Sequence, residues 1–164
     1  MNAFAGYTVR RIRREDDAAL AAIIRRNFEQ HGLAVPGTVY FDPELDRLST
    51  VYLAGPGTDY FVLTAEDGTV LGGIGYAAFP LFEGCAECQK LYLADGVKGR
   101  GLGRALVGLC EEKARAAGYR SLYMETNAKF AVAVALYRKL GYTEIDRPAC
   151  VNHAAMDRFF LKTI

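Results

Sequence analysis

Hydrophobic and polar residues follow two spacings that alternate along the chain. Runs with period two, or runs rich in β-branched and aromatic residues, predict strands, whereas apolar residues three or four positions apart predict helices. Strands are expected at residues 7–12, 59–65, 70–79, 87–94, 121–126, 142–146 and 156–163. Helices are expected at residues 15–30, 42–54 and 129–140, and in a segment that opens at the glycines of 97–103 and ends near Ala117.

Turn residues support these boundaries. Asp67-Gly68 joins two β-rich runs and is a strong signal for a hairpin. Pro43 suits the first turn of the helix at 42–54. In the helix at 129–140 three apolar residues share one side: Val132, Leu136 and Leu140.

The order of elements indicates a single α/β (α+β) domain over residues 1–164, with its core at about 7–163. The 164 residues are 51% hydrophobic, which is enough for a chain of this size to bury a core. We find no internal repeat and no low-complexity linker that would divide the chain. We therefore expect one sheet with helices packed on it.

The charge balance excludes some classes of partner. Lysine and arginine number 20 against 19 acidic residues, so there is no basic excess that would indicate a nucleic-acid partner. No apolar run reaches the roughly 20 residues that a membrane-spanning helix needs. The N-terminal residues lack the pattern of a signal peptide, and four arginines follow between positions 10 and 14. We expect a cytoplasmic protein without a membrane partner.

Four cysteines, Cys85, Cys88, Cys110 and Cys150, are expected to be free thiols in a protein of this size and location. Cys85 and Cys88 have the spacing of a zinc or redox pair. A zinc site, however, needs a second close-spaced pair, and Cys110 and Cys150 do not supply one. We predict no metal.

A glycine-rich segment, Lys98-Gly99-Arg100-Gly101-Leu102-Gly103, lies between a predicted strand and a predicted helix. Glycines allow close approach of a ligand, and the amides at a helix N-terminus bind phosphate groups. A Walker loop would need Gly-Lys-Ser/Thr, and Gly103 is followed by Arg104-Ala105. A dinucleotide-binding loop would need a third glycine where Leu106 stands. The segment therefore predicts a phosphate site of a different kind.

Lys98-x-x-Gly101-x-Gly103, after Leu91-Tyr92-Leu93, resembles the acetyl-CoA signature of GNAT acetyltransferases, Arg/Gln-x-x-Gly-x-Gly/Ala. Lysine replaces the usual Arg or Gln, which keeps a cation near the anion. A second match follows the first in the family's order. Residues 125–127 (Glu-Thr-Asn) and 135–142 (Ala-Leu-Tyr-Arg-Lys-Leu-Gly-Tyr) are similar to the family's asparagine region and its Leu-Tyr-x-Lys-x-Gly-Phe motif, with tyrosine in place of Phe.

The resemblance implies a fold and a cofactor. The fold is a single GNAT-like domain with a mixed, mostly antiparallel sheet of about seven strands, splayed central strands and about four helices. The cofactor is acetyl-CoA, bound as acyl donor, with its arm paired to the backbone of Leu91 and Leu93. Asn127 matches an asparagine that contacts this arm, and a turn or helix-cap role is the alternative. The implied cofactor-binding residues are Leu91, Leu93, Lys98, Gly99, Arg100, Gly101, Leu102, Gly103, Arg104 and Asn127.

The resemblance also implies catalytic groups for direct attack of an amine in a ternary complex. Tyr137 matches the family's tyrosine and is the expected acid for the departing thiolate; packing in the core is the alternative. Glu87 precedes Lys98 by the separation at which some members place a catalytic glutamate. A water relay is the alternative base. We expect a main-chain amide near Leu93 to stabilise the oxyanion.

Acceptor groups in this fold come from the first helices, the loop between them and the turn before the last strand. The candidates are His31, Tyr40, Asp42, Gln89 and His153, with Asp46 and Asn152 nearby. Two carboxylates in this set suit an ammonium-bearing molecule. The whole pattern looks like bacterial members that act on amino acids or other small amines.

Three matters stay open. The acceptor could also be a protein or peptide tail, and the chain could be a sensor or structural module that binds acetyl-CoA without turnover. The expected partner is a small-molecule amine. The expected assembly is a monomer or a homodimer.

Overall fold

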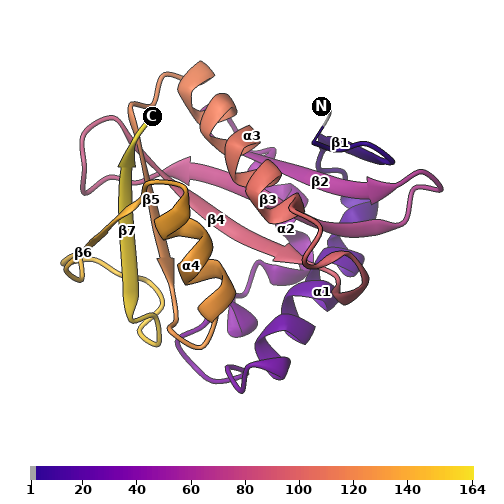
Figure 1. Cartoon of the computed structure of the whole chain (residues 1–164), viewed down its shortest axis with the longest axis horizontal. Coiled ribbons are helices and arrows are strands. Elements are labelled where there is room, and N and C mark those ends of the chain that lie inside the picture. The colour runs from indigo at the N-terminus through magenta and orange to yellow at the C-terminus, as the bar shows by residue number, and fades with distance from the viewer. Residues whose placement is uncertain (1–2) are drawn as a thin grey trace.

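The computed structural model describes residues 3–164. In this part of the chain seven strands form one sheet in the order β1-β2-β3-β4-β5-β7-β6 (Figure 1). The strands are β1 Tyr7–Arg11, β2 Asp59–Ala65, β3 Val70–Ala78, β4 Cys85–Leu93, β5 Ser121–Thr126, β6 Thr143–Ile145 and β7 Arg158–Thr163. The α-helices are α1 Asp17–Gln30, α2 Leu48–Tyr52, α3 Leu102–Ala116 and α4 Ala131–Lys139. None of these helices combines the length and apolar character that a membrane crossing requires.

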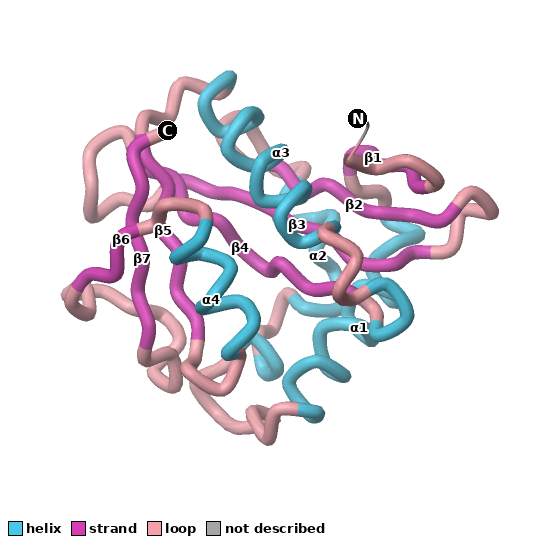
Figure 2. The backbone as a smooth tube through the Cα atoms, viewed as in Figure 1, coloured by secondary structure: helices cyan, strands magenta, loops and turns pink. Residues whose placement is uncertain are grey.

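Helices cover both faces of the sheet. α3 and α4 lie on the near face in Figure 2, and α1 and α2 lie behind it. The core under α1 and α2 is built from large buried side chains: Leu20, Ile24, Phe28, Leu48, Tyr52 and Tyr60. The core under α3 and α4 has its own set: Leu106, Val107, Cys110, Val134, Tyr137 and Phe160. The sheet therefore separates two hydrophobic clusters, one on each face.

The predicted fold is confirmed as a single domain with a mixed sheet of seven strands and four α-helices. The Asp67-Gly68 hairpin joins β2 to β3, with the Gly68 amide donating to the Ala65 carbonyl at 3.0 Å. β4 begins at Cys85, earlier than predicted, because Cys85 and Ala86 pair with β5 and are buried.

The predicted helix at 42–54 is wrong in its first half. Asp42 is extended, with φ −59° and ψ 129°. A residue before proline disfavours the helical region, so Pro43 delays the helix instead of opening it. A 3-10 turn at Leu45–Arg47 follows, and α2 begins at Leu48.

The side of α4 that carries Val132 is not its buried face. Val132 is 86% exposed, whereas Val134 and Tyr137 are buried. The first turns of α4 are apolar all round, Ala-Val-Ala-Val-Ala-Leu, so the pattern does not select a unique face.

The centre of the sheet splays open. β4 and β5 pair in parallel only up to Glu87 and Tyr123, although β4 continues to Leu93 and β5 to Thr126. Every other pair of neighbouring strands among residues 3–164 is antiparallel. The unpaired edges beyond Glu87 leave an opening between two strands that meet at their other end, as the sequence resemblance implied.

A β-bulge in β4 lies beside this opening. Gln89 pairs with Gly75 and Tyr92 pairs with Gly73, so Lys90 and Leu91 together oppose Ile74. Lys90 has φ 52°, a left-handed conformation that costs a non-glycine residue about 1–3 kcal/mol. The bulge changes which face each later side chain occupies.

Candidate active site

A small cavity lies where β4 and β5 diverge. Its volume is about 40 Å³. β4 supplies most of the wall, β5 supplies one carboxylate, and the turn at Val39–Phe41 and the segment before β7 close the sides. The lining residues are Val39, Glu87, Cys88, Gln89, Lys90, Tyr92, Glu125, His153 and Met156.

Glu87 presents an acceptor oxygen to this cavity. Its Oε2 accepts a hydrogen bond from Gln89 Nε2 at 2.6 Å, and the Tyr52 hydroxyl donates to Gln89 Oε1 at 2.7 Å. Its Oε1 has no hydrogen-bond partner within residues 3–164. Every buried side-chain polar atom in this part of the chain has a hydrogen-bond partner, so Oε1 is not buried and must be accessible. Burial, reinforced by the charge of Glu125, raises the pKa of Glu87 above its usual value. A carboxylate with a raised pKa is a better base.

His153 joins three segments around the cavity. Its Nε2 lies 2.8 Å from Asp42 and its Nδ1 lies 2.8 Å from Glu125. Both nitrogens must donate to face two carboxylates, so this geometry describes an imidazolium. Burial alone would lower the pKa of His153, but the hydrogen bonds to Asp42 and Glu125 raise it to about 9. The Tyr123 hydroxyl donates to the other oxygen of Glu125 at 3.1 Å.

Lys90 is a site residue that the sequence analysis missed. Its Nζ lies 3.1 Å from Asp42, and its side chain is 13% exposed. Burial alone would raise the pKa of Asp42, but its bonds to His153 and Lys90 lower this pKa below its usual value. Period-two alternation along a strand puts Gln89 on the face of Glu87, as observed, whereas a regular strand would put Lys90 on the opposite face. The signal for the bulge was the glycine-rich strand opposite, Gly72-Gly73-x-Gly75.

The glycine segment and the start of α3 form an exposed cradle. Gly99 and Gly101 have φ of 76° and 78°, and a side chain at either would meet no atom within 4 Å. The first helical bond of α3 runs from Ala105 to the Gly101 carbonyl at 3.1 Å. The preceding amides thus have no intrahelical acceptor and point outward beside a helix dipole. This cradle fits a pyrophosphate.

The side chains of this segment are arranged around the cradle in different ways. Lys98 Nζ lies 2.9 Å from Asp95, which also accepts from Arg26 and Gln30. Arg100 donates to the Tyr7 hydroxyl at 3.1 Å. Arg104 is exposed, and Leu102 is buried in a small core cluster.

The free edge of β4 carries the main-chain groups of Leu91 and Leu93. The Ala94 amide donates to the Leu71 carbonyl at 2.8 Å, so Ala94 is turned toward β3. Hydrogen-bonding direction alternates along an antiparallel pair, and Leu93 therefore points its amide and carbonyl toward the opening. The Leu93 carbonyl accepts from Asn27 at 3.0 Å, which leaves its amide available. Pairing of Leu91 and Leu93 with the cofactor stays a prediction.

Tyr137 belongs to the buried cluster on the α3 and α4 side of the sheet. Its ring packs against Tyr142 and Phe160, with centroids at 6.1 and 5.7 Å. Burial, with smaller effects of nearby Cys88 and Cys110, raises the pKa of Tyr137, so the hydroxyl stays protonated. This hydroxyl has no hydrogen-bond partner in the described chain. Because every buried side-chain polar atom described there has a partner, the Tyr137 hydroxyl is not buried and remains accessible. It is a free donor beside Cys88, which lines the cavity.

Other predicted site residues lie outside the cavity or are bonded to the protein. His31 packs on Phe130 at 4.6 Å and bonds the Asn27 carbonyl. The Tyr40 hydroxyl donates to Glu29 at 2.8 Å. Neither His31 nor Tyr40 lines the cavity. Asp46 pairs with Arg25 at 2.7 Å, and Asn152 is exposed.

Asn127 holds a turn in this structure. Its side-chain amide donates to the Ala155 carbonyl at 2.8 Å, and its oxygen accepts from the Lys129 amide at 2.9 Å. These are the contacts of a turn-forming residue. A direct contact of Asn127 with the cofactor stays a prediction.

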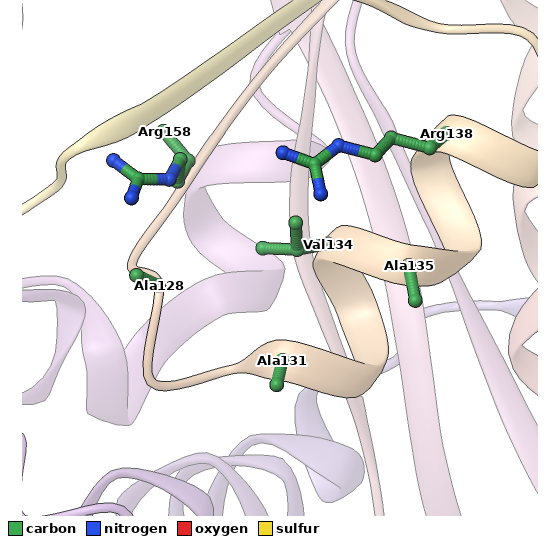
Figure 3. Close-up of a pocket in the computed structure, with 6 residues that line it drawn as sticks. All are labelled: Ala128, Ala131, Val134, Ala135, Arg138 and Arg158. Carbon is green, nitrogen blue, oxygen red and sulfur yellow. The ribbon is translucent and has the colours of Figure 1, made fainter.

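A second, larger hollow lies on the flank of α4 that faces away from the glycine segment. It has a volume of about 280 Å³ and is lined by Ala128, Ala131, Val134, Ala135, Arg138 and Arg158 (Figure 3). Figure 3 shows Arg138 extending over Val134 toward Arg158. Both arginines pair with Glu144, at 2.6 and 3.5 Å. Its lining contains no group that could accept a proton from an amine, so the smaller cavity is the candidate active site.

The cysteines are free thiols. Cys85, Cys88 and Cys110 are buried, and Cys150 is exposed. Within residues 3–164 no group of three or more His, Cys, Asp or Glu residues could hold a metal ion.

Comparisons with known proteins agree with this geometry. The sequence model of the acetyltransferase (GNAT) family matches residues 17–142. The uncharacterized N-acetyltransferase YjgM of Escherichia coli K12 is 38% identical over 88% of this chain and 87% of its own. An L-methionine sulfoximine/L-methionine sulfone acetyltransferase of Pseudomonas aeruginosa PAO1 is 33% identical over 51% of each chain. A phosphinothricin acetyltransferase from Sinorhizobium meliloti, solved with acetyl-CoA, superposes with TM-score 0.76 at 20% identity, covering 97% of this chain and 89% of its own.

The chain therefore belongs to the acetyltransferase (GNAT) family and is an acetyl-CoA-dependent acetyltransferase.

Proposed function

We propose that this enzyme transfers the acetyl group to the primary amine of a small molecule, an amino acid or another small amine, by direct attack in a ternary complex. The observation that carries the proposal is the unbonded oxygen of Glu87 in a small, charged cavity at the splayed strands. An ammonium entering there meets a carboxylate with a raised pKa.

The side chains around the cavity favour a small acceptor. Val39 lies on one side and His153 and Met156 on another, and the His153 imidazolium ties both sides to β5 through its two carboxylates. A peptide tail would need an open groove. The two relatives named for small acceptors, methionine sulfoximine or sulfone and phosphinothricin, support the same class.

Acetyl-CoA supplies the thioester when bound, and the residues of this chain supply the rest. The amides at the start of α3 bind its pyrophosphate, and the free edge of β4 orients its arm. Glu87 Oε1 takes the proton of the attacking ammonium. The Leu93 amide stabilises the oxyanion, and the Tyr137 hydroxyl gives its proton to the departing sulfur.

A screen for thiol release tests the proposal. The protein is mixed with acetyl-CoA and a panel of amino acids, other small amines and peptides, and free coenzyme A is measured against the rate without amine. We expect amine-dependent release with at least one small amine and an acetylated product of matching mass. Release with peptides alone would make it a peptide acetyltransferase, and acetyl-CoA binding without release on any amine would make it a sensor.

The cradle at α3 gives a separate prediction. Gly101→Asp should weaken acetyl-CoA binding by about 10- to 100-fold, because like charges about 4 Å apart near a protein surface repel by a few kcal/mol. Gly101→Asn is the matched control, since Asn and Asp both tolerate the left-handed conformation and have the same shape. A binding titration on both folded variants measures the difference. Equal affinities for acetyl-CoA in the two variants would contradict a phosphate site at Gly101.

A further inference from the structure

Lys90 is an enclosed cation with donors to spare. Its ammonium group has three N–H donors, and Asp42 is its partner within the described residues, at 3.1 Å. Its side chain is 13% exposed and lines the cavity. A cation in this position is available for a second anion without losing the first.

A strained backbone conformation directs the Lys90 side chain into the cavity. The bulge opposite Ile74 and the φ of 52° turn Lys90 to the same face as Gln89. In a regular strand the Lys90 side chain would lie with Cys88 on the α3 and α4 side. Strained conformations of this kind persist where the surrounding structure holds them, and they cluster at functional sites.

The charged side chains of the cavity come from three segments. Glu87 and Lys90 lie on β4 and Glu125 lies on β5, and Lys90 pairs with Asp42. His153 has both nitrogens engaged by carboxylates. Among the residues lining the cavity, Lys90 is thus the cation that can still bind a ligand.

We propose that Lys90 binds the carboxylate of the acceptor, so that the substrate is a small amino acid held by its amine at Glu87 and by its carboxylate at Lys90. This inference rests on the proposed function and narrows it. The bond between Lys90 and Asp42 fixes the ammonium, and its remaining N–H groups face the ligand.

The test compares each amino acid that is turned over with its primary amide, which keeps the amine and removes the negative charge. In Lys90→Met, kcat/KM for the amino acid should fall by about 10- to 100-fold, the effect of one charge-assisted hydrogen bond, while the amide should change by less than about threefold. Met has a similar unbranched shape and adopts the same backbone with no added branch. The ratio of wild-type to variant kcat/KM is taken for the acid and for the amide. Dividing the first ratio by the second removes the intrinsic reactivity difference between acid and amide.

Two further variants sharpen the result. Lys90→Arg should recover most of the preference for the acid, because it restores a cation. Lys113→Met removes an exposed lysine of α3 that pairs with its neighbour Glu112, and it should leave both substrates unchanged.

Several outcomes would overturn the inference. Equal losses for acid and amide in Lys90→Met would show that Lys90 only positions Asp42. A wild-type enzyme that turns over amides or simple amines as well as the acids would remove the carboxylate from the recognition while leaving the proposed function intact. Absence of turnover on every amine in the screen would overturn both.

Discussion

Glu87→Gln should lower kcat/KM for the amine acceptor by about 10²–10⁴-fold, the range typical of a general base. Glutamine keeps the shape of the side chain and can still meet Gln89, but it cannot take a proton. The free oxygen of Glu87 and its raised pKa both indicate that proton transfer is what the residue supplies. Turnover is measured by thiol release with an amine identified in the screen.

The pH profile distinguishes this loss from a structural one. Glu87 is active when ionised, and its pKa is raised, so wild-type kcat/KM should fall with decreasing pH at a higher pH than an ordinary carboxyl would give. Glu87→Gln should lack this acidic limb. A loss below about threefold, with the limb retained, would support the water relay instead.

Glu125 is the competing carboxylate at the same cavity. Both of its oxygens are engaged, one by His153 and the other by the Tyr123 hydroxyl. Glu125→Gln should therefore weaken activity through the position of His153 and should keep the acidic limb. If the limb disappears in Glu125→Gln and persists in Glu87→Gln, the two roles are reversed.

Local patterns were enough to predict the framework of this enzyme. The hairpin at Asp67-Gly68 and the strands of β2 and β5 depend on neighbours in the sequence, and they were predicted at the ends observed. Period-two alternation puts Glu87 and Gln89 on one face, and the structure agrees because that part of β4 is regular. The start of α3 was predicted because glycines and a helix N-terminus are local features.

The parts that failed depend on contacts between distant segments. His153 was a candidate by position, yet nothing local shows that it lies between Asp42 and Glu125. Lys90 was missed because one bulge reverses the alternation of the strand. The exposure of Val132 could not be predicted, because an apolar helix does not reveal which side meets the sheet.

Tyr137→Phe should reduce turnover by about 10- to 1000-fold at saturating acetyl-CoA, while acetyl-CoA binding and the melting temperature change little. The hydroxyl bonds no other group of the described chain, so its removal leaves no polar atom of the core unpaired. The ring contacts with Tyr142 and Phe160 remain in the variant. Only the protonation of the departing sulfur should suffer.

The fall in turnover of Tyr137→Phe should be smaller than the fall expected on removing a catalytic nucleophile. The thiolate of coenzyme A is a moderately good leaving group and can depart slowly without an acid. Turnover, a binding titration and a melting curve are measured on the same preparation.

Tyr92→Phe is the competing variant, since Tyr92 also lines the cavity but packs on the α1 side against Phe28. Wild-type turnover in Tyr137→Phe together with a large loss in Tyr92→Phe would transfer the acid role to Tyr92. Parallel losses of turnover and stability in Tyr137→Phe would reduce Tyr137 to a core residue. A loss of turnover alone would identify its hydroxyl as the proton donor, because one oxygen is the whole difference between the two proteins.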